Sequence, residues 1–208
     1  MKVDLHIHTT YSDGSISPEQ VVNIASGLNL KAIAITDHDT VNGVLPALME
    51  AKKFPDIEVI PGIEMSTYYR DQEVHILGYY VDYNDKNLRK TLELLTANRI
   101  KRAIKIVDKL NKLGIKIDFN DIKQKSNDAS IGRPHIAMAL ADRGYVTSIE
   151  DAFNKYLNKG KPAYVPKKKL TPSDAVKIIT HSFGIPVLAH PGHIDNEDII
   201  KDIIKFGI

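Results

Sequence analysis

Short apolar runs alternate along the chain with amphipathic stretches, and most of the apolar runs end in polar segments that contain histidine. The run Val3-Asp4-Leu5-His6-Ile7-His8 predicts a first strand, in which alternation sends His6 and His8 to the same side. Residues 30–36 are almost continuously apolar, as expected for a strand buried on both faces, and they end in Asp37-His38-Asp39-Thr40. In both places, polar side chains follow the carboxyl end of a strand.

Three further stretches predict the rest of the sheet: a strand over residues 57–64, a hairpin with arms 65–69 and 73–80, and a strand over 185–189. The Pro61-Gly62 pair predicts a bend or bulge just before Glu64. His75 falls on the second arm of the hairpin, and His190 follows the last strand. The pattern of a strand followed by a metal-binding type of side chain is therefore repeated.

Helical periodicity separates these strands. Capping residues followed by proline, at Ser17-Pro18 and Thr171-Pro172, predict two helix starts, and another helix is expected over residues 43–53. An apolar stripe over residues 86–113 predicts a long amphipathic helix. Helices over 133–143 and 148–157 follow, and the one strand signal between residues 98 and 165 is a short segment at 115–119.

The repeated order of strand, polar loop and helix predicts an α/β fold with a parallel sheet and a barrel-type active face. We expect residues 1–97 to form the N-terminal part of the barrel, residues 98–165 a helical insertion subdomain, and residues 166–208 the C-terminal part of the barrel. At 208 residues the chain is long enough for one sizeable core and a small appended subdomain.

Composition narrows the chemistry. The chain has no cysteine, which excludes disulfides, thiolate metal sites and cysteine nucleophiles, so any metal must be held by histidine and carboxylate. A formal net charge of +2 predicts no strong attraction to nucleic acid or membrane. No apolar run reaches membrane-spanning length and no signal-peptide pattern is present, so we expect a cytoplasmic protein with no membrane contact.

Seven side chains are candidate metal ligands, and most lie at or just beyond the end of a predicted strand. They are His6, His8, Asp13, His38, Glu64, His75 and His190. Packing does not explain this placement, because an apolar core gains nothing from imidazoles at its rim. Histidines and carboxylates without thiolates suit manganese, zinc or iron, and seven ligands exceed the need of one four-coordinate ion. The pattern predicts two or three divalent metal ions.

Glu64 is the natural bridging ligand, because its two carboxylate oxygens can each bind one ion. Two ions about 3.5–4 Å apart can convert a bridging water into hydroxide near neutral pH and stabilise a phosphoryl oxygen during in-line attack. Hydrolysis of a phosphate ester is the reaction that most needs this help. Glu64, His38 and Asp13 are therefore the candidate catalytic residues, whereas Asp4, Asp37 and Asp39 are expected to orient the imidazoles.

Five motifs resemble those of the PHP (polymerase and histidinol phosphatase) family. They are Asp4-Leu5-His6-Ile7-His8, Thr36-Asp37-His38-Asp39-Thr40, Gly62-Ile63-Glu64, Val74-His75-Ile76-Leu77-Gly78 and Leu188-Ala189-His190-Pro191-Gly192. Ile131-Gly132-Arg133-Pro134-His135 and Lys161-Pro162-Ala163-Tyr164-Val165-Pro166 resemble the branch that hydrolyses 3',5'-bisphosphonucleotides and short RNA 5' ends. The resemblance extends over nearly the whole chain.

The resemblance implies a distorted (βα)7 barrel with a trinuclear site and a phosphoesterase that acts on a small nucleotide or a short RNA, with no obligate protein partner. It assigns His6, His8 and Glu64 to one ion, Glu64 and His75 to a second, and Asp13, His38 and His190 to a third or to shared positions. Arg133 and His135 would hold the phosphate near a helix N-terminus, where backbone N–H groups favour an anion.

Several alternatives stay open at this point. The family pattern continues into another strand and a late Asp-x-His motif that this sequence does not contain, so we expect an incomplete C-terminal end and an uncertain activity for this chain alone. A histidinol-phosphate-type phosphatase, a catalytically incomplete metal-binding or regulatory module, and an amidohydrolase are the rivals. Arg133 and His135 also suit a surface arginine and a helix-face histidine, and the lysines and arginines of residues 98–125 suit either a solvated helix face or attraction of an RNA backbone.

Overall fold

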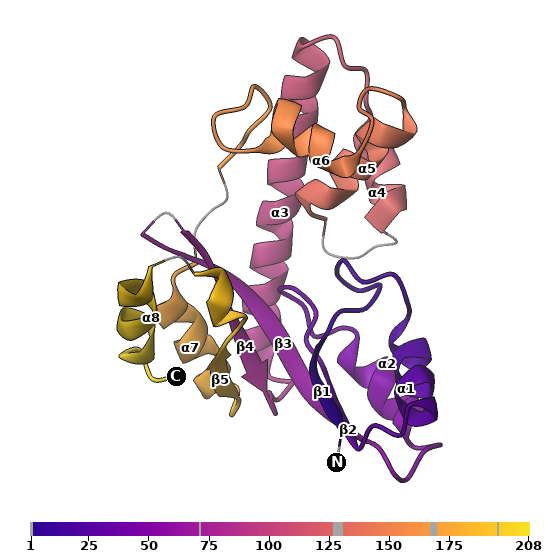
Figure 1. Cartoon of the computed structure of the whole chain (residues 1–208), viewed down its shortest axis with the longest axis vertical. Helices are drawn as coiled ribbons and strands as arrows, with labels where there is room; N and C mark the ends of the chain where they lie inside the picture. The colour runs from indigo at the N-terminus through magenta and orange to yellow at the C-terminus, as the bar shows by residue number, and fades with distance from the viewer. Residues whose placement is uncertain (1, 71, 127–130, 167–169, 195) are drawn as a thin grey trace. The chain divides into compact units, whose positions relative to one another are not determined.

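The computed structural model describes residues 2–70, 72–126, 131–166, 170–194 and 196–208, with the backbone alone at 124–126. It divides into two compact units, one made of Met1–Glu93 with Lys169–Ile208 and the other of Leu94–Lys168. Along the chain, the second unit is therefore inserted between the two segments of the first. Each unit is described below by itself, with the element labels of Figure 1.

The first unit contains a mixed five-stranded sheet in the order β1-β2-β3-β4-β5. Its strands are β1 (Val3–Ile7), β2 (Ala32–Ile35), β3 (Glu58–Tyr69), β4 (Gln72–Tyr79) and β5 (Ile185–Leu188). β1, β2 and β3 pair in parallel, whereas β4 is antiparallel to both β3 and β5. The α/β class is confirmed, and the parallel sheet predicted from the sequence is interrupted by the one reversed strand, β4, which is the second arm of the predicted hairpin.

β3 differs from its prediction. Residues 57–64 and 65–69 were expected to form separate strands, but β3 is one 12-residue strand with no register shift at Pro61-Gly62. No bulge interrupts β3 at this point, and the strand changes partner instead: Pro61 still pairs with β2, and Gly62 already pairs with β4. Glycine is required at this crossing, since a Cβ on Gly62 would lie 2.7 Å from the backbone oxygen of Ile35.

The helices of the first unit cover its sheet. Those that lie wholly within it are α1 (Pro18–Gly27), α2 (Val44–Ala51), α7 (Pro172–His181) and α8 (Glu197–Ile204), with a short 3₁₀ turn at Pro191–His193, and the start of α3 (Lys86–Lys112) also belongs to it. α1 packs against α2 and β2, and α7 packs against β3, β4 and β5. α1 begins as predicted, because the Ser17 hydroxyl accepts a hydrogen bond from the Gln20 N–H and the Gln20 side chain accepts one from the Ser17 N–H.

The sheet of the first unit is strongly curved. Although β2 and β3 separate β4 from β1, the Tyr79 hydroxyl on β4 donates a hydrogen bond of 2.9 Å to the backbone oxygen of Leu5 on β1. The rings of His6, on one edge strand, and His190, just after the other, stack with their centroids 5.8 Å apart. Curvature of this kind gathers side chains from the ends of non-adjacent strands at one rim.

The second unit consists of helices and the loops that connect them, with no strand among its described residues. It contains the part of α3 (Lys86–Lys112) from Leu94 onward, α4 (Phe119–Ser126), α5 (Arg133–Asp142), α6 (Ile149–Ala152) and a π-helical turn at Phe153–Leu157. Its core includes the fully buried Ile106, Leu110, Ile122, Ile136, Leu140 and Leu157. Among the helices that the structure describes, none has the length and apolar character needed to cross a membrane.

The strand predicted at residues 115–119 is wrong. No pairing strand forms there, and α4 already begins at Phe119. Ile115 and Ile117 are nevertheless buried in the core of the second unit. Their alternation with polar residues therefore reflects a single extended segment packed on helices, which has the same periodicity as a half-buried strand.

Candidate metal centre

Glu64 lies at the centre of a group of histidines at the rim of the curved sheet. Its side chain is 1% exposed. The segment that follows β2 continues alongside β3 here, because the Glu64 N–H donates to the Asp37 carbonyl at 3.2 Å and the Asp39 N–H donates to the Glu64 carbonyl at 2.9 Å. This backbone pairing brings His38 next to Glu64 and fixes the position of Glu64 relative to the segment after β2.

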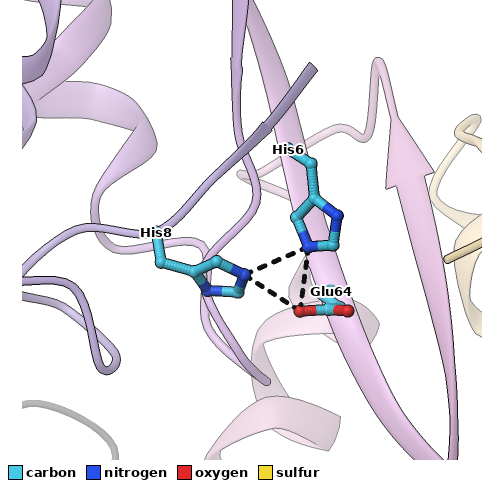
Figure 2. A group of neighbouring side chains, drawn as sticks. All are labelled: His6, His8 and Glu64. Carbon is cyan, nitrogen blue, oxygen red and sulfur yellow. Dashed lines mark hydrogen bonds and ion pairs between the residues drawn. The ribbon is translucent and has the colours of Figure 1, made fainter. Parts of the chain in front are cut away.

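Five imidazole nitrogens surround the Glu64 carboxylate. Oε2 lies 3.2 Å from His6 Nε2, 3.1 Å from His8 Nε2 and 3.2 Å from His38 Nδ1, and Oε1 lies 3.0 Å from His75 Nδ1 and 3.1 Å from His190 Nε2. Figure 2 shows His6 and His8 converging on this carboxylate, with their Nε2 atoms 3.1 Å apart. Asp13 extends the cluster, at 3.4 Å from His8 and 3.8 Å from His38. The structure thus brings all seven predicted ligands together.

These spacings fit shared cations. Two atoms bound to the same ion at about 2.0–2.2 Å, at right or tetrahedral angles, lie about 2.8–3.6 Å apart. His38 Nδ1 and His75 Nε2 are buried and make no hydrogen bond to the described residues, although His38 Nδ1 is 3.2 Å from Glu64. Buried nitrogens without a hydrogen-bond partner, within a cluster of other ligand-type atoms, suit binding to a cation. The donor set therefore fits divalent metal ions.

The ligand atoms form three overlapping groups, each with its atoms within 4.8 Å of one another. The groups are His6, His8 and Glu64; His8, Asp13 and His38; and His38, Glu64 and His75. Glu64 belongs to two of them. A neutral imidazole offers one lone pair, whereas a carboxylate offers two oxygens, so Glu64 is the member best suited to serve two groups at once.

The electrostatics of the cluster centre on the buried carboxylate. Burial raises the pKa of Glu64, but hydrogen bonds from His6, His75 and His8 outweigh it and hold that pKa far below its usual range. Burial lowers the pKa of His75, but its hydrogen bond to Glu64 prevails and raises it to about 9. For His38 burial prevails and lowers the pKa to about 4. In the metal-free protein, His38 is therefore neutral at pH 7 and His75 is protonated.

Metal uptake should release protons at neutral pH. A cation must displace the proton of His75, whereas His38 already offers its lone pair, so the apparent affinity should rise with pH up to about 9, by about tenfold per unit for each proton displaced. Calorimetric titration with Zn²⁺ at pH 7, in two buffers of different ionisation enthalpy, should show at least one proton released per chain.

The variant His75→Gln should release about one proton fewer than the wild-type chain. His181→Gln serves as the control, because His181 lies outside the cluster, with Nδ1 2.6 Å from the Lys177 carbonyl. Equal heats in the two buffers would contradict the assignment of His75 as a protonated ligand.

Arg133 and His135 lie in the second unit, in the first turn of α5 as predicted. An Arg133 Nη1–H donates to the Leu157 carbonyl at 3.4 Å, and its guanidinium lies 5.3 Å from the centre of the Phe153 ring. His135 is buried, and its Nδ1 accepts a hydrogen bond of 3.0 Å from the Gly132 N–H. His135 is therefore on the buried face of α5.

Two of the lysines and arginines of residues 98–125 hydrogen-bond to backbone carbonyls of the same unit. Arg102 Nε donates to the Val165 carbonyl at 2.8 Å, and Lys109 Nζ donates to the Tyr164 carbonyl at 2.6 Å. Both therefore fasten residues 164–165 to α3. The side chain of Lys125, at the end of the same stretch, lies outside the described residues.

A cavity of about 210 Å³ adjoins the metal-ligand cluster. It is lined by Glu73, Val74, His75, Ala189, His190, His193 and Ile194. Two of these residues, His75 and His190, belong to the cluster. Glu73 is not among the residues predicted from the sequence, although it is two residues from His75 on β4 and therefore faces the same side of the strand. Glu73 Oε1 lies 3.5 Å from His75 Nε2. The cavity provides room for a substrate group beside the ligands.

Comparison with known proteins identifies the family and the fold. Residues 4–195 match the family model described as PHP domain. The chain is 37% identical over 190 residues to the 5'-3' exoribonuclease Rnm of Escherichia coli, covering 91% of this chain and 65% of that protein. It is 34% identical over 194 residues to the 3',5'-nucleoside bisphosphate phosphatase of Chromobacterium violaceum, covering 93% of this chain and 68% of that protein.

Two solved structures resemble the whole chain, each with a TM-score of 0.88 over 100% of its length and 75% of theirs. One is described as an amidohydrolase from Chromobacterium violaceum with bound sulfate and no metal, at 32% identity. The other is described as a putative metal-dependent phosphoesterase from Bifidobacterium adolescentis, at 26% identity. The chain spans about two thirds of the length of the curated relatives it matches.

Proposed function

Because the chain belongs to the PHP domain family, we propose that it is a metal-dependent phosphoesterase that hydrolyses phosphate monoesters of 3',5'-bisphosphonucleotides or the 5' ends of short RNA. The observation that carries the proposal is the group of five imidazole nitrogens within 3.2 Å of one buried carboxylate, Glu64. The names of the relatives, an exoribonuclease and a nucleoside bisphosphate phosphatase, support the substrate class.

The proposed centre holds two or three divalent ions of manganese, zinc or iron. When bound, such ions lower the pKa of a water molecule and offset the negative charge of phosphoryl oxygens. Glu64 would join two ion positions through its two oxygens, with His6 and His8 on one side and His75 on the other. The Asp13 side chain is 41% exposed and that of His190 is 35% exposed, so solvent reaches the cluster at both of these ligands.

The central carboxylate also favours a phosphoesterase over an amidohydrolase, the description given to one similar structure. Amidohydrolases usually place a carboxylated lysine where this chain has Glu64. A histidinol-phosphate-type activity uses the same centre and differs only in the leaving group. A metal-binding module without turnover is the remaining alternative, and only a rate measurement separates it from an enzyme.

The finer architecture and the location belong to the same proposal. We infer that the curved five-stranded sheet is part of a distorted (βα)7 barrel, supported by the Tyr79 hydrogen bond to β1 and by the stacked rings of His6 and His190. The unit Leu94–Lys168 would be the insertion into this barrel, as its position along the chain suggests. A cytoplasmic location agrees with a nucleotide or RNA substrate.

A substrate panel tests the proposed function. The metal-reconstituted protein is assayed with a 3',5'-bisphosphonucleotide, a 5'-phosphorylated oligoribonucleotide, histidinol phosphate and an N-acyl amino acid, with Mn²⁺ present and again with a chelator. We expect the highest kcat/KM for one of the two nucleotide substrates and no turnover with the chelator. Preference for histidinol phosphate would show that the substrate is not a nucleotide or RNA. Hydrolysis of the N-acyl amino acid alone would overturn the proposal.

Arg133→Ala should raise the KM for the phosphorylated substrate by about 10- to 100-fold with a smaller change in kcat, because it removes charged hydrogen bonds to phosphate worth about 1.5–3 kcal/mol. Arg143→Ala is the matched control, since Arg143 lies at the other end of α5 and pairs with Asp121 at 2.7 Å. Steady-state kinetics of both variants give the comparison. An unaltered KM in Arg133→Ala would remove this arginine from the substrate site.

A further inference from the structure

A buried hydrogen-bond network lies directly behind the metal-ligand cluster. Asp37, only 1% exposed, accepts three hydrogen bonds: from the Thr9 N–H at 2.6 Å and the Ser12 hydroxyl at 2.6 Å on Oδ1, and from the Thr9 hydroxyl at 2.7 Å on Oδ2. Thr9 and Ser12 are also buried. The carboxylate therefore ties the loop after β1 to the end of β2.

The network reaches one metal ligand through Ser12. The Ser12 oxygen lies 3.3 Å from His8 Nδ1, while His8 Nε2 points at Glu64 and at His6. A serine hydroxyl has a single hydrogen, and its shortest contact is the one to Asp37, which can only accept it. Ser12 therefore presents a lone pair to His8, so His8 Nδ1 must carry a hydrogen and donate it.

We propose that Asp37 and Ser12 are positioning residues that hold His8 as its Nδ1–H tautomer, with the Nε2 lone pair directed at the cation. A histidine binds metal through whichever nitrogen the hydrogen bond to the other nitrogen leaves free. Asp13 Oδ1, at 3.4 Å from His8 Nδ1, accepts from the same side and reinforces this tautomer. The sequence predicts that Asp37 orients an imidazole. In the structure it does so indirectly, because Ser12 lies between Asp37 and His8.

The packing around Asp37 gives a second way to disturb the network. A Cβ on Gly43 would lie 2.5 Å from Asp37 Oδ2 and 3.0 Å from Thr9 Oγ1. The backbone of Gly43 is in an ordinary right-handed helical conformation, so an alanine there adds no backbone strain and acts through its contacts with these side chains. Gly43→Ala should displace the Asp37 carboxylate without changing the chemistry of any member of the network.

The inference rests on the metal centre of the proposed function, so its test measures metal binding and the tautomer instead of turnover. The whole chain is loaded with Zn²⁺, and long-range ¹H–¹⁵N NMR identifies the protonated nitrogen of His8, assigned by comparison with His8→Gln. Zn²⁺ affinity is measured by competition with a chromophoric chelator. The variants are Ser12→Ala and Gly43→Ala, and the matched controls are Ser182→Ala and Gly27→Ala.

The controls change the same residue types elsewhere in the first unit. Ser182 is a buried serine whose hydroxyl donates to the Ile179 carbonyl at 2.8 Å, and a Cβ on Gly27 would meet no atom within 4 Å. Ser12→Ala and Gly43→Ala should weaken Zn²⁺ binding by about 10- to 100-fold. In both variants, His8 should exchange between its Nδ1–H and Nε2–H tautomers. Both controls should keep the wild-type affinity and the Nδ1–H signal.

Three results would overturn the inference: a Ser12→Ala protein with the wild-type tautomer and affinity, an equal loss of affinity in Ser182→Ala, or a wild-type protein that binds no Zn²⁺ through His8. The proposed function can fail separately. A wild-type protein that binds Zn²⁺ and responds to Ser12→Ala as expected, yet hydrolyses no phosphorylated substrate, would leave the positioning role intact and remove the enzymatic one.

Discussion

Glu64→Gln should abolish metal-dependent hydrolysis, with kcat/KM falling by about 10³-fold or more. The amide keeps the size of the side chain but removes its negative charge and one of its two acceptor oxygens. Five imidazole nitrogens now face this carboxylate at 3.0–3.2 Å, so its loss affects every proposed ion position that shares it. Elemental analysis of the purified variant should show fewer ions per chain than the wild type.

Glu58→Gln is the matched control for this experiment. Glu58 lies on the same strand, β3, is exposed, and accepts a hydrogen bond of 3.2 Å from the Tyr80 hydroxyl outside the cluster. It should retain the wild-type rate and metal content. A Glu64→Gln protein with normal turnover and normal metal content would show that Glu64 is not the shared ligand.

Gly14→Ala should destabilise the fold by about 1–3 kcal/mol, the usual cost of overpacking, and reduce the metal content of the purified protein. A Cβ on Gly14 would overlap the backbone carbonyl of His8 and lie 2.7 Å from the Thr9 nitrogen. These are backbone atoms, so they cannot move aside as a flexible side chain can. The loop that carries Asp13 would have to rearrange, and His8 and Asp13 would move with it. Thermal unfolding and elemental analysis give the two measurements.

Gly27→Ala provides the comparison for Gly14→Ala, because a Cβ on Gly27 meets no atom within 4 Å. It should leave metal content unchanged and stability equal to or above that of the wild type, since alanine favours the helix. If Gly14→Ala bound metal and unfolded as the wild type does, the close approach of this loop to His8 would not be a requirement of the site.

The ligand cluster was predictable because the relevant signal is local. Most of the ligands directly follow, or alternate within, a short apolar run, and parallel strands bring their carboxyl ends to one rim. His6 and His8 are the clearest example, since alternation alone puts them on one side of β1. The same local rule also places Glu73 beside His75, although Glu73 carries no other signal in the sequence.

The roles of the aspartates in the site were less predictable, because they depend on contacts between distant residues. Asp37 meets Thr9 and Ser12, 28 and 25 residues earlier, and Asp39 accepts a hydrogen bond of 2.9 Å from the Ser66 N–H, 27 residues later. Asp4 accepts from the backbone N–H of His6 at 3.2 Å, so this contact fixes the chain and not the ring. Hydrogen bonds between residues so far apart in the sequence cannot be predicted from the periodicity of apolar and polar positions.

Parts of the fold show the same limit. The 12-residue length of β3 follows from a change of partner strand at Gly62, which no pattern of hydrophobic positions reveals. α8 is not among the predicted helices, although its signals are local: the Asn196 side chain caps it by accepting from the Asp198 N–H, and Ile199 and Ile203 are both buried, four residues apart. The sequence pattern does not reveal this helix because it is short and half of its residues are polar, as in a loop.

Anomalous X-ray scattering from crystals of the chain grown with Mn²⁺ would test the metal centre most directly, because it reports the element, the number of ions and their ligands together. We predict at least two anomalous peaks within about 4 Å of each other, with Glu64 bound to both and His6 and His8 bound to one. Peaks that are absent from the Glu64 cluster, or a single peak without Glu64 among its ligands, would contradict a shared metal centre.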